Sequence, residues 1–356
     1  MPTEQLMPVM LHAFQFRAMN TKIEIALRTA DMELVAKAKA FAADWFRFAE
    51  QRFSRFRTDS ELSLLNRAGG KPYLVSESML EVLSLTKHYE AVTEGAFSPF
   101  VLSAMHRAGY RDSFERMQTD PLTYSGLETP GYEPASLVHP VMVIDRGMRA
   151  VTLPQGHPID LGGIVKSWAV NRLGIFLRTR LGIAHGLINA GGDLTTWGTR
   201  TAEGEPWTVT AEHPWEPEKS VGTVKLSGPY ASAATSSKLG RSWTTASGAQ
   251  HHLIDPSTMA PSRSDVVQCT VVGTHAADCE VWAKTICILG LHEGAARMAR
   301  QAPGYEALVF TADGAMVLIA DVASVDRRWA VPGAAVLLPS MLNAHDTTKL
   351  NREASL

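Results

Sequence analysis

The chain has 356 residues, a formal net charge of −2 at pH 7 and a hydrophobic content of 45%. This length accommodates one large domain or two ordinary ones, and the apolar share supports a substantial core. The balanced charge offers no basic footprint for nucleic acid, and no apolar run reaches the ~18 residues of a transmembrane helix, so we expect neither nucleic acid nor a membrane span.

The first part of the chain is predicted to form strands and then helices. Residues 1–11 are expected to be disordered, and alternating apolar residues over 14–27 predict a strand that a bulge or turn interrupts at 19–21. Apolar residues at spacings of three and four predict helices over 31–49 and 76–93.

Capping residues and helix breakers add detail to this first part. Ser76 is expected to cap the second helix, and Asp59 or Ser60 is expected to cap a short helix that ends near residue 66. Residues 112–139 are polar and rich in Pro and Gly, which predicts a long surface excursion with little regular structure.

The second part of the chain mixes strands and helices and ends in a polar tail. A hairpin is predicted over 141–151, and the small residues of 229–237 suit close backbone packing or a ligand-facing turn. Further strands are predicted over 207–211, 222–226, 266–273, 305–310 and 316–320, and further helices over 276–289 and 292–300. Residues 12–337 are therefore expected to form the folded domain, and the polar tail 338–356 is expected to be disordered.

The N-terminus and the cysteines bear on the cellular compartment. The opening MPTEQLMPVMLHAFQF lacks the basic region, apolar region and cleavage site of a secretory signal. The three cysteines, Cys269, Cys279 and Cys287, are odd in number and clustered late. This is typical of small buried hydrophobes rather than of a disulfide framework or a zinc site, and we expect a cytoplasmic protein.

Two glycine pairs, each beside an aspartate, flank one predicted helix. Asp160-Leu-Gly-Gly163 precedes the helical periodicity of 165–177, and Asn189-Ala-Gly-Gly-Asp193 follows the apolar 186–188, a predicted strand. Glycine permits close approach of the backbone to a ligand, and free N–H groups at a helix start favour phosphate. One interpretation is a nucleotide or pyrophosphate site at the first turn of that helix. The other is two tight turns in an α/β unit, and these residues leave both open.

Several common site motifs are absent from the sequence. The residue before Lys166 is Val165 rather than glycine, so P-loop spacing fails. No GxGxxG opens a helix after a strand, and neither HExxH nor GxSxG occurs. His252 precedes Asp255-Pro256 and is a candidate general base or phosphate donor, although a surface histidine in a turn is the simpler interpretation of these residues.

The helix predicted over 276–289 is apolar almost all round, which is typical of a buried helix. It nevertheless carries Glu280 and Lys284, which are four residues apart and hence adjacent on one face. An exposed pair would contribute only about 0.3–0.5 kcal/mol, whereas a buried pair must offset several kcal/mol of desolvation per ion. Because so apolar a helix has little solvated surface, we favour a pair lining a polar cavity.

The order of these motifs resembles that of the ApbE family, the FAD:protein FMN transferases. The resemblance runs from about Met19 to Gly290 and is carried by FSRFRTDSELSLLNRAGG, GAFSPFV, IDLGGIVKSWAVNR, INAGGDL, ATSS, HHLIDP and AADCEVWAKTICILG. It implies one mixed α/β (α+β) domain of two lobes, with mixed sheets flanked by helices and FAD in the cleft between the lobes. It also implies an enzyme that cleaves the FAD pyrophosphate with the help of magnesium, passes FMN to a Ser or Thr hydroxyl of an acceptor protein and releases AMP.

The resemblance also implies a set of flavin-nucleotide contacts. Met19 matches a methionine that lies against the flavin, with Asn20 where glycine is usual, and Phe56 matches a flavin-stacking tyrosine without its hydroxyl. His252 is implied to lie near the flavin nucleotide and the reacting phosphates. The implied FAD-binding residues are Met19, Phe56, Asp160, Gly162, Gly163, Lys166, Asn189, Gly191, Gly192, Asp193, Thr235, Ser236, His252 and Asp255.

The largest departure from the family lies on the late helix. The family has an Asp and, four residues on, a Thr as side-chain ligands of magnesium, whereas these positions hold Glu280 and Lys284, with Asp278 nearby but out of register. A protonated lysine has only donors and cannot ligate a metal. We hypothesise that Lys284, paired with Glu280, replaces the metal and neutralises the FAD pyrophosphate directly, which makes Glu280 a doubtful magnesium ligand.

Two classes of function follow from these residues. The first is an FAD:protein FMN transferase with altered or absent magnesium dependence, in which His252, Lys284 and Glu280 are the catalytic candidates. The second is a non-catalytic FAD-binding protein, a flavin carrier or redox flavoprotein, and FAD pyrophosphatase activity is a further alternative. Asn171 replaces a usual aspartate, and Ser167 and Ser237 replace usual glycines. The departures at Asn171, Ser237 and Lys284 favour the second class, but most of the residues of the nucleotide core are retained, so the transferase is the preferred interpretation.

Overall fold

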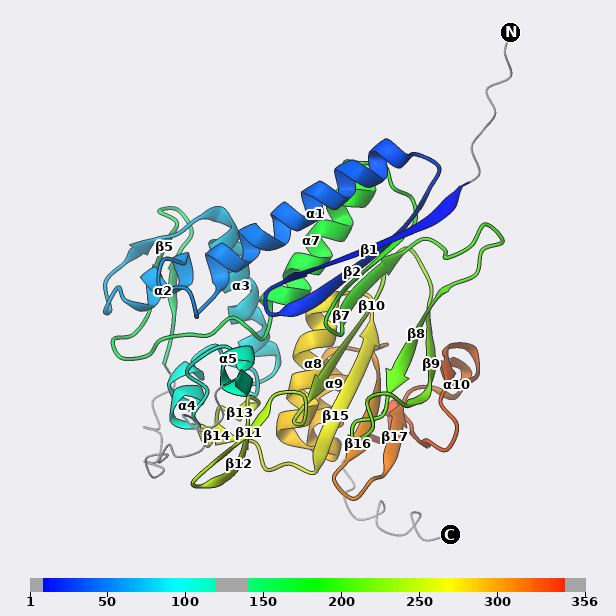
Figure 1. Cartoon of the computed structure of the whole chain (residues 1–356). Coiled ribbons are helices and arrows are strands. Elements are labelled where there is room, and N and C mark those ends of the chain that lie inside the picture. Colours follow the sequence, from blue (N-terminus) through cyan, green and yellow to red (C-terminus); the bar gives the residue numbers. More distant parts are fainter. Residues whose placement is uncertain (1–8, 120–139, 343–356) are drawn as a thin grey trace.

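A mixed nine-stranded sheet runs through the molecule (Figure 1). The computed structural model describes residues 9–119 and 140–342. In spatial order the strands are β1 (Met10–Ala18), β2 (Thr21–Thr29), β6 (Gly186–Ala190), β7 (Asp193–Trp197), β10 (Ala231–Ser237), β15 (Val266–Gly273), β16 (Glu306–Thr311), β17 (Met316–Ile319) and β19 (Ala335–Leu337). Neighbouring strands are antiparallel except β17 and β19, which are parallel.

Helices pack on one face of this sheet (Figure 1). They are α1 (Met32–Phe53), α7 (Val165–Thr179), α8 (Ala276–Leu289) and α9 (Leu291–Gln301). Successive strand residues point to opposite faces, so Ala234 and Val271 pack with Trp282 of α8 in one buried cluster. Their neighbours Ala233 and Val272 belong to a different cluster on the other face.

A second, three-stranded sheet covers that other face. It contains β8 (Trp207–Glu212), β9 (Ser220–Leu226) and β18 (Trp329–Ala330), and α10 (Val322–Arg328) leads into β18. Trp207 and Val224 from this sheet pack with Ala233 and Leu308. The central strands are therefore buried on both faces.

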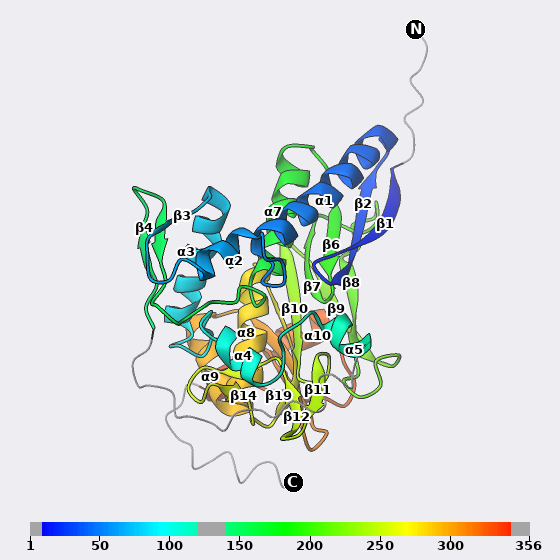
Figure 2. The ribbon, with the colours of Figure 1, turned by 60° about the vertical axis from the view of Figure 1, so that its left-hand side comes forward.

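A largely helical lobe lies beside the nine-stranded sheet (Figure 2). It contains α2 (Glu61–Asn66), α3 (Glu77–Val92), α4 (Leu102–Arg107), α5 (Phe114–Thr119) and the small sheet of β3 (Tyr73–Leu74), β5 (Ala150–Thr152) and β4 (Val143–Asp145). Two hairpins, β11 (Ser242–Thr245) with β12 (Gly248–His251) and β13 (Ile254–Asp255) with β14 (Ala260–Pro261), lie below it. The molecule is thus a mixed α/β domain of two lobes, as expected.

The predicted helix starts are confirmed by side-chain caps. Ser60 accepts a hydrogen bond from the Ser63 N–H (3.0 Å), and Ser76 accepts one from the Met79 N–H (3.2 Å). Each satisfies one of the N–H groups that a helix start leaves without a backbone partner. Of the two candidate caps for α2, Ser60 rather than Asp59 takes this role.

Several boundaries differ from the sequence prediction. Strand β1 begins at Met10, inside the segment expected to be disordered, and its pairing with β2 makes the interrupted strand of 14–27 a hairpin. Helix α5 lies within the predicted surface excursion of 112–139, whose remainder from residue 120 lies outside the described residues. Helix α11 (Pro339–Leu342) lies within the predicted tail, and residues 343–356 are likewise outside the described part.

Two central strands were not recognised from the sequence. Strand β7 was not predicted, and most of the small-residue stretch 229–237, which was expected to give close backbone packing or a ligand-facing turn, forms the closely packed strand β10. Nearly every residue of both strands is buried, so neither shows the alternation that identifies a half-buried strand. Among the described residues, no helix is long and apolar enough to cross a membrane.

Gly294 sets the approach of α9 to α8, and its replacement provides a stability test. A Cβ at Gly294 would lie 2.6 Å from Cα of Ile286, so we expect Gly294→Ala to destabilise the fold by about 1–3 kcal/mol. This loss should outweigh the ~1 kcal/mol gain in helix propensity. Gly240→Ala is the control, because no atom lies within 4 Å of the added Cβ. It should change the free energy of unfolding by no more than about 0.5 kcal/mol. Equal denaturation midpoints for the two variants would contradict the proposed packing constraint.

Candidate functional site

A cleft of about 1180 Å³ lies between the helical lobe and the nine-stranded sheet. The helical lobe contributes residues from the end of α1, from α4 and α5 and from the 160–163 loop, and the sheet contributes β10, β15 and two hairpin turns. Lys284 and Ile288 of α8 also line it. Small-molecule pockets commonly measure about 300–1,000 Å³, so this cleft has room for an extended ligand.

Two tight hairpin turns face each other at the sheet side of the cleft. Met19 and Asn20 connect β1 to β2 with φ of 52° and 57°, and Gly191 and Gly192 connect β6 to β7 with φ of 64° and 97°. Positive φ at both central residues is typical of two-residue hairpin turns and explains Asn20, Gly191 and Gly192, whereas Met19 adopts the same conformation without being a residue type that favours it. A Cβ at Gly191 would lie 2.0 Å from the hydroxyl oxygen of Thr21, so the glycine allows one turn to pack on the other.

The first turn of α7 lies at the cleft, directly after the Asp160-Leu-Gly-Gly163 loop. A carboxylate oxygen of Asp160 accepts a hydrogen bond from the Gly162 N–H (2.8 Å), which shapes the loop. A Cβ at Gly163 would lie 3.2 Å from the ring of Phe97 and 3.4 Å from Cε of Lys284. Gly163 therefore lets the loop and the Lys284 side chain lie against each other.

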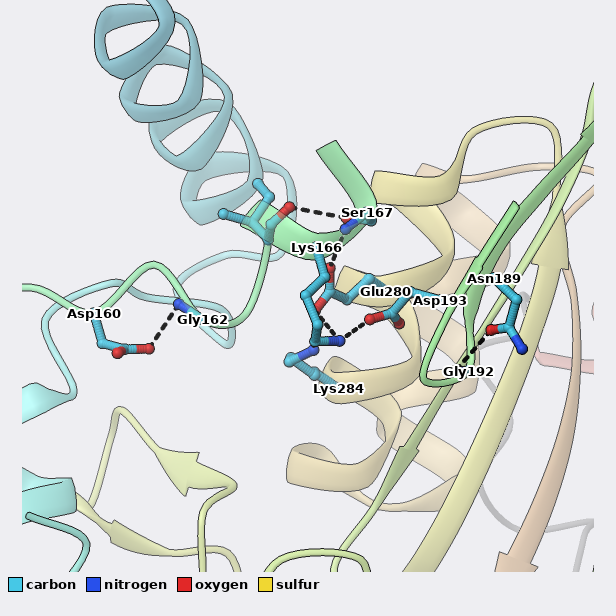
Figure 3. Close-up of polar contacts among 10 residues, drawn as sticks. Asp160, Gly162, Lys166, Ser167, Asn189, Gly192, Asp193, Glu280 and Lys284 are labelled. Atoms are coloured by element: carbon cyan, nitrogen blue, oxygen red, sulfur yellow. Dashed lines mark hydrogen bonds and ion pairs between the residues drawn. The ribbon is translucent and has the colours of Figure 1, made fainter. Parts of the chain in front are cut away.

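Two lysines and two carboxylates form one network beside this turn. Figure 3 shows Lys166 of α7 and Lys284 of α8 pointing toward Glu280, with Asp193 of β7 beside Glu280 and joined to Lys166. The Lys284 ammonium donates to Oε1 of Glu280 (2.8 Å), and Nζ of Lys166 lies 3.6 Å from the same oxygen and contacts Asp193. The lysines line the cleft, whereas the carboxylates lie behind them.

Burial and neighbouring charge set the protonation states in this network. Burial alone would raise the pKa of Glu280, but Lys284 and Lys166 outweigh it and hold this pKa at about 2. Burial lowers the pKa of Lys166 to about 8, and Glu280 opposes the shift while Lys284 and Arg241 add to it. Glu280 is therefore ionised at pH 7, and Lys166 is protonated.

His252 lines the cleft on the side of the β11–β12 hairpin. Burial, together with Arg241 and Lys284, lowers its pKa well below 6.5, so the imidazole is neutral at pH 7. Its Nδ1 lies 3.4 Å from the carbonyl oxygen of Arg241. This contact favours the tautomer with the proton on Nδ1, which leaves Nε2 as a proton acceptor.

Aromatic rings and a guanidinium form the helical-lobe wall of the cleft. The Arg55 guanidinium carbon lies 4.2 Å from the ring centroid of Phe56 and 4.4 Å from that of Tyr110. Trp243 packs on Tyr110 with ring centroids 5.2 Å apart, and its indole N–H donates to the Ala108 carbonyl. This wall presents a π surface, and the network of lysines and carboxylates presents cations to the same cleft.

The side chains at the expected metal position do not fit a magnesium site. Oε1 of Glu280 accepts from Lys284, and Oε2 accepts from the Ser167 N–H (3.2 Å), so both oxygens are engaged. Asp278 accepts hydrogen bonds from the hydroxyls of Tyr89 and Tyr305 instead. Within the described residues, no three His, Cys, Asp or Glu side chains are grouped to hold a metal.

Most of the predicted site residues meet at the cleft. Those that line it are Phe56, Asp160, Gly162, Gly163, Lys166, Asn189, Gly191, Gly192, Thr235, Ser236, His252 and Lys284. Asp193 and Glu280 contact its lysines from behind. Met19 and Asp255 are not among the lining residues: Met19 is partly buried against the hydrophobic cluster that includes β2, α1 and α7, and Asp255 accepts hydrogen bonds from Ser257.

Sequence reasoning missed three residues of this site. Arg55, Tyr110 and Arg241 line the cleft but were not singled out. Arg55 adjoins Phe56 in the FSRFRT segment and would have been a candidate from that position alone. Tyr110 and Arg241 have no comparable local signal, because each reaches the cleft only through packing of the surrounding turns.

Comparison with known proteins agrees with this architecture. The sequence profile of the ApbE family matches residues 19–309. The chain is 25% identical to an FAD:protein FMN transferase of Klebsiella pneumoniae (74% of this chain, 78% of the relative) and 26% identical to one of Vibrio cholerae (74% and 77%). It shares its fold with the crystal structure of the ApbE protein of Thermotoga maritima (TM-score 0.71, 19% identity, 87% and 97% covered) and with the flavin transferase ApbE of Vibrio cholerae (0.68, 21%, 87% and 97%). With a matched profile over most of its length and a shared fold, the chain belongs to the ApbE family.

Proposed function

We propose that the chain is an FAD:protein FMN transferase that uses lysines where relatives of its family use magnesium. The network of Lys166, Lys284, Asp193 and Glu280 carries this proposal, because it presents two ammonium groups to the cleft at the first turn of α7. A helix start and fixed cations both favour phosphate. The aromatic wall suits a flavin ring, and the relatives' names supply the reaction class.

The proposed step is a displacement at the FMN phosphorus of FAD. A Ser or Thr oxygen of the acceptor protein forms a bond to this phosphorus, and the bond from phosphorus to the bridging oxygen breaks. The bridging oxygen leaves with AMP, and the hydroxyl proton passes to Nε2 of His252, which is neutral and able to accept it. Lys284 and Lys166 stabilise the charge that develops on the phosphate oxygens.

In this step Lys284 would supply only the positive charge of the metal ion that it replaces. An ammonium group neutralises the negative charge of phosphate oxygens and donates hydrogen bonds to them, but it does not provide the Lewis-acid activation of a metal ion. Its pairing with Glu280 holds the ammonium in position before any ligand arrives. We therefore expect a slower reaction than in a metal-dependent relative, and FAD binding that needs no divalent cation.

Incubation with FAD and a small-molecule-depleted cell extract tests the proposed activity. We expect a covalent FMN increment on an acceptor polypeptide, visible as flavin fluorescence after denaturing electrophoresis and in the intact mass, together with AMP release. An unchanged acceptor mass with FAD bound would identify a flavin carrier. FMN and AMP without a labelled protein would identify an FAD pyrophosphatase. Either result would contradict the transferase.

Exchange of the network's residues tests the metal replacement. FAD binding by the unmodified chain, measured by titration calorimetry, should be the same in EDTA and in magnesium. Lys284→Met should lower the transfer rate by about 10²-fold or more, since one fixed donor to the transition state is lost. The double variant Glu280→Asp and Lys284→Thr restores the family's ligand types and should gain magnesium dependence.

The exposed Lys219 provides the control for these substitutions. It pairs with Glu216 on the surface with a 63% exposed side chain, so Lys219→Met should leave FAD binding and transfer unchanged. Loss of FAD binding by the unmodified chain in EDTA would refute the metal replacement.

The pH dependence of transfer tests the role of His252. Since burial lowers its pKa well below 6.5, the base form persists down to that pH, and the rate should decline only at lower pH. His252→Asn should reduce the rate by about 10²-fold. His251→Asn is the matched control, because the His251 Nε2 contacts the Ser262 carbonyl and the ring does not line the cleft. A rate that already declines between pH 7.5 and 6.5 would argue against His252 as the base.

A further inference from the structure

Arg55 is a buried cation on the cleft wall that the proposed reaction does not use. Its side chain is 6% exposed, and its Nε lies 3.0 Å from a carboxylate oxygen of Asp160, whose side chain is 11% exposed. Nη1 donates to the carbonyl oxygen of Tyr110 (3.1 Å). Nη2 is buried without a hydrogen-bond partner in the described part of the chain. Burying a charge in this way is costly unless it has a specific partner.

The contacts of Arg55 join three segments that line the cleft. Its own turn follows α1 and carries Phe56, whose ring stacks on the guanidinium. The guanidinium also lies against the ring of Tyr110, in the segment between α4 and α5, and the Phe56 and Tyr110 rings contact each other edge-on with centroids 6.1 Å apart. Asp160 belongs to the loop that leads through Gly162 and Gly163 into α7 and Lys166. Arg55 therefore fixes the aromatic wall relative to the loop that supplies the phosphate-facing helix start.

Asp160 is a carboxylate in a cleft that is proposed to take a polyanion. Within the described residues, Arg55 is the cation that forms an ion pair with it. His106 lies 3.5 Å from the Arg55 guanidinium, but burial and then Arg55 lower its pKa, so it remains neutral at pH 7. Without Arg55, Asp160 would present an uncompensated negative charge to the phosphates of a ligand.

We propose that Arg55 is a positioning and specificity-determining residue, which holds the Phe56 ring as a platform and cancels the charge of Asp160 so that the cleft accepts an anionic flavin dinucleotide. This inference rests on the proposed function, because it takes FAD as the ligand. It predicts that loss of Arg55 weakens binding of the charged FAD more than binding of the uncharged riboflavin.

Arg55→Met separates the charge effect from a general loss of structure. We expect its Kd for FAD, measured by fluorescence titration at low salt, to rise by about tenfold more than its Kd for riboflavin, since an unpaired Asp160 repels only the phosphates. This difference should shrink at high salt, where the repulsion is screened. Equal weakening of FAD and riboflavin binding would overturn the proposal and leave Arg55 a structural residue only.

Two further variants keep the test valid if Arg55→Met folds poorly. Arg55→Met with Asp160→Asn removes both charges but retains the oxygen that accepts from the Gly162 N–H, so the ratio of the FAD and riboflavin Kd values should return to that of the unmodified chain. Arg55→Lys keeps the positive charge but loses the planar guanidinium. It should therefore weaken the binding of both ligands while preserving the ratio of the FAD and riboflavin Kd values. No recovery in the double variant would refute the role of charge.

The neighbouring Arg57 provides a matched control. It pairs with Asp59 on the surface with a 44% exposed side chain and does not line the cleft, so Arg57→Met should change neither Kd. If the unmodified chain fails to bind FAD, the proposed function itself fails. If it binds FAD but Arg55→Met affects both ligands equally, only the inference about Arg55 fails.

Discussion

Glu280 is a fully buried carboxylate, and the arrangement of the cleft depends on how its charge is met. Lys284 reaches it from one turn further along α8, and Lys166 and the Ser167 N–H reach it from the first turn of α7. Removing one partner from a buried ion pair typically costs about 3–5 kcal/mol. The carboxylate therefore holds the first turn of α7 and the middle of α8, far apart in the sequence, in one fixed relation.

The same arrangement determines what the cleft presents to a ligand. Asp193 and Glu280 lie behind Lys166 and Lys284, so the ammonium groups face the cavity and the carboxylates do not. Such preorganised cations cost no rearrangement when charge develops on a phosphate. In the aromatic wall, too, a buried charge is met by a partner: Arg55 compensates Asp160, and its guanidinium lies against the rings of Phe56 and Tyr110.

Prediction of the fold succeeded for amphipathic helices and for strongly apolar elements such as α8, β15 and β16, and it failed for two buried strands that contain few large apolar residues. Helices α1 and α3 have a buried stripe and a polar side, so periodicity and caps located them. Strand β10 is made of small residues because α8 packs on one face and the β8–β9 sheet on the other. Its sequence therefore lacks alternation, and β7, also buried on both faces, was missed for the same reason.

Local geometry explains what the sequence alone determined about the site. Helix periodicity places Glu280 and Lys284 on one face of an apolar helix, and backbone sterics explain the glycine pairs around α7. Both features could therefore be interpreted from the sequence without knowledge of the fold. Only the tertiary structure could decide that Lys166 meets Glu280, that Arg55 meets Asp160, and that Met19 packs against the core. These contacts join residues distant along the chain, and the burial of whole faces, rather than any local pattern, brings such residues together.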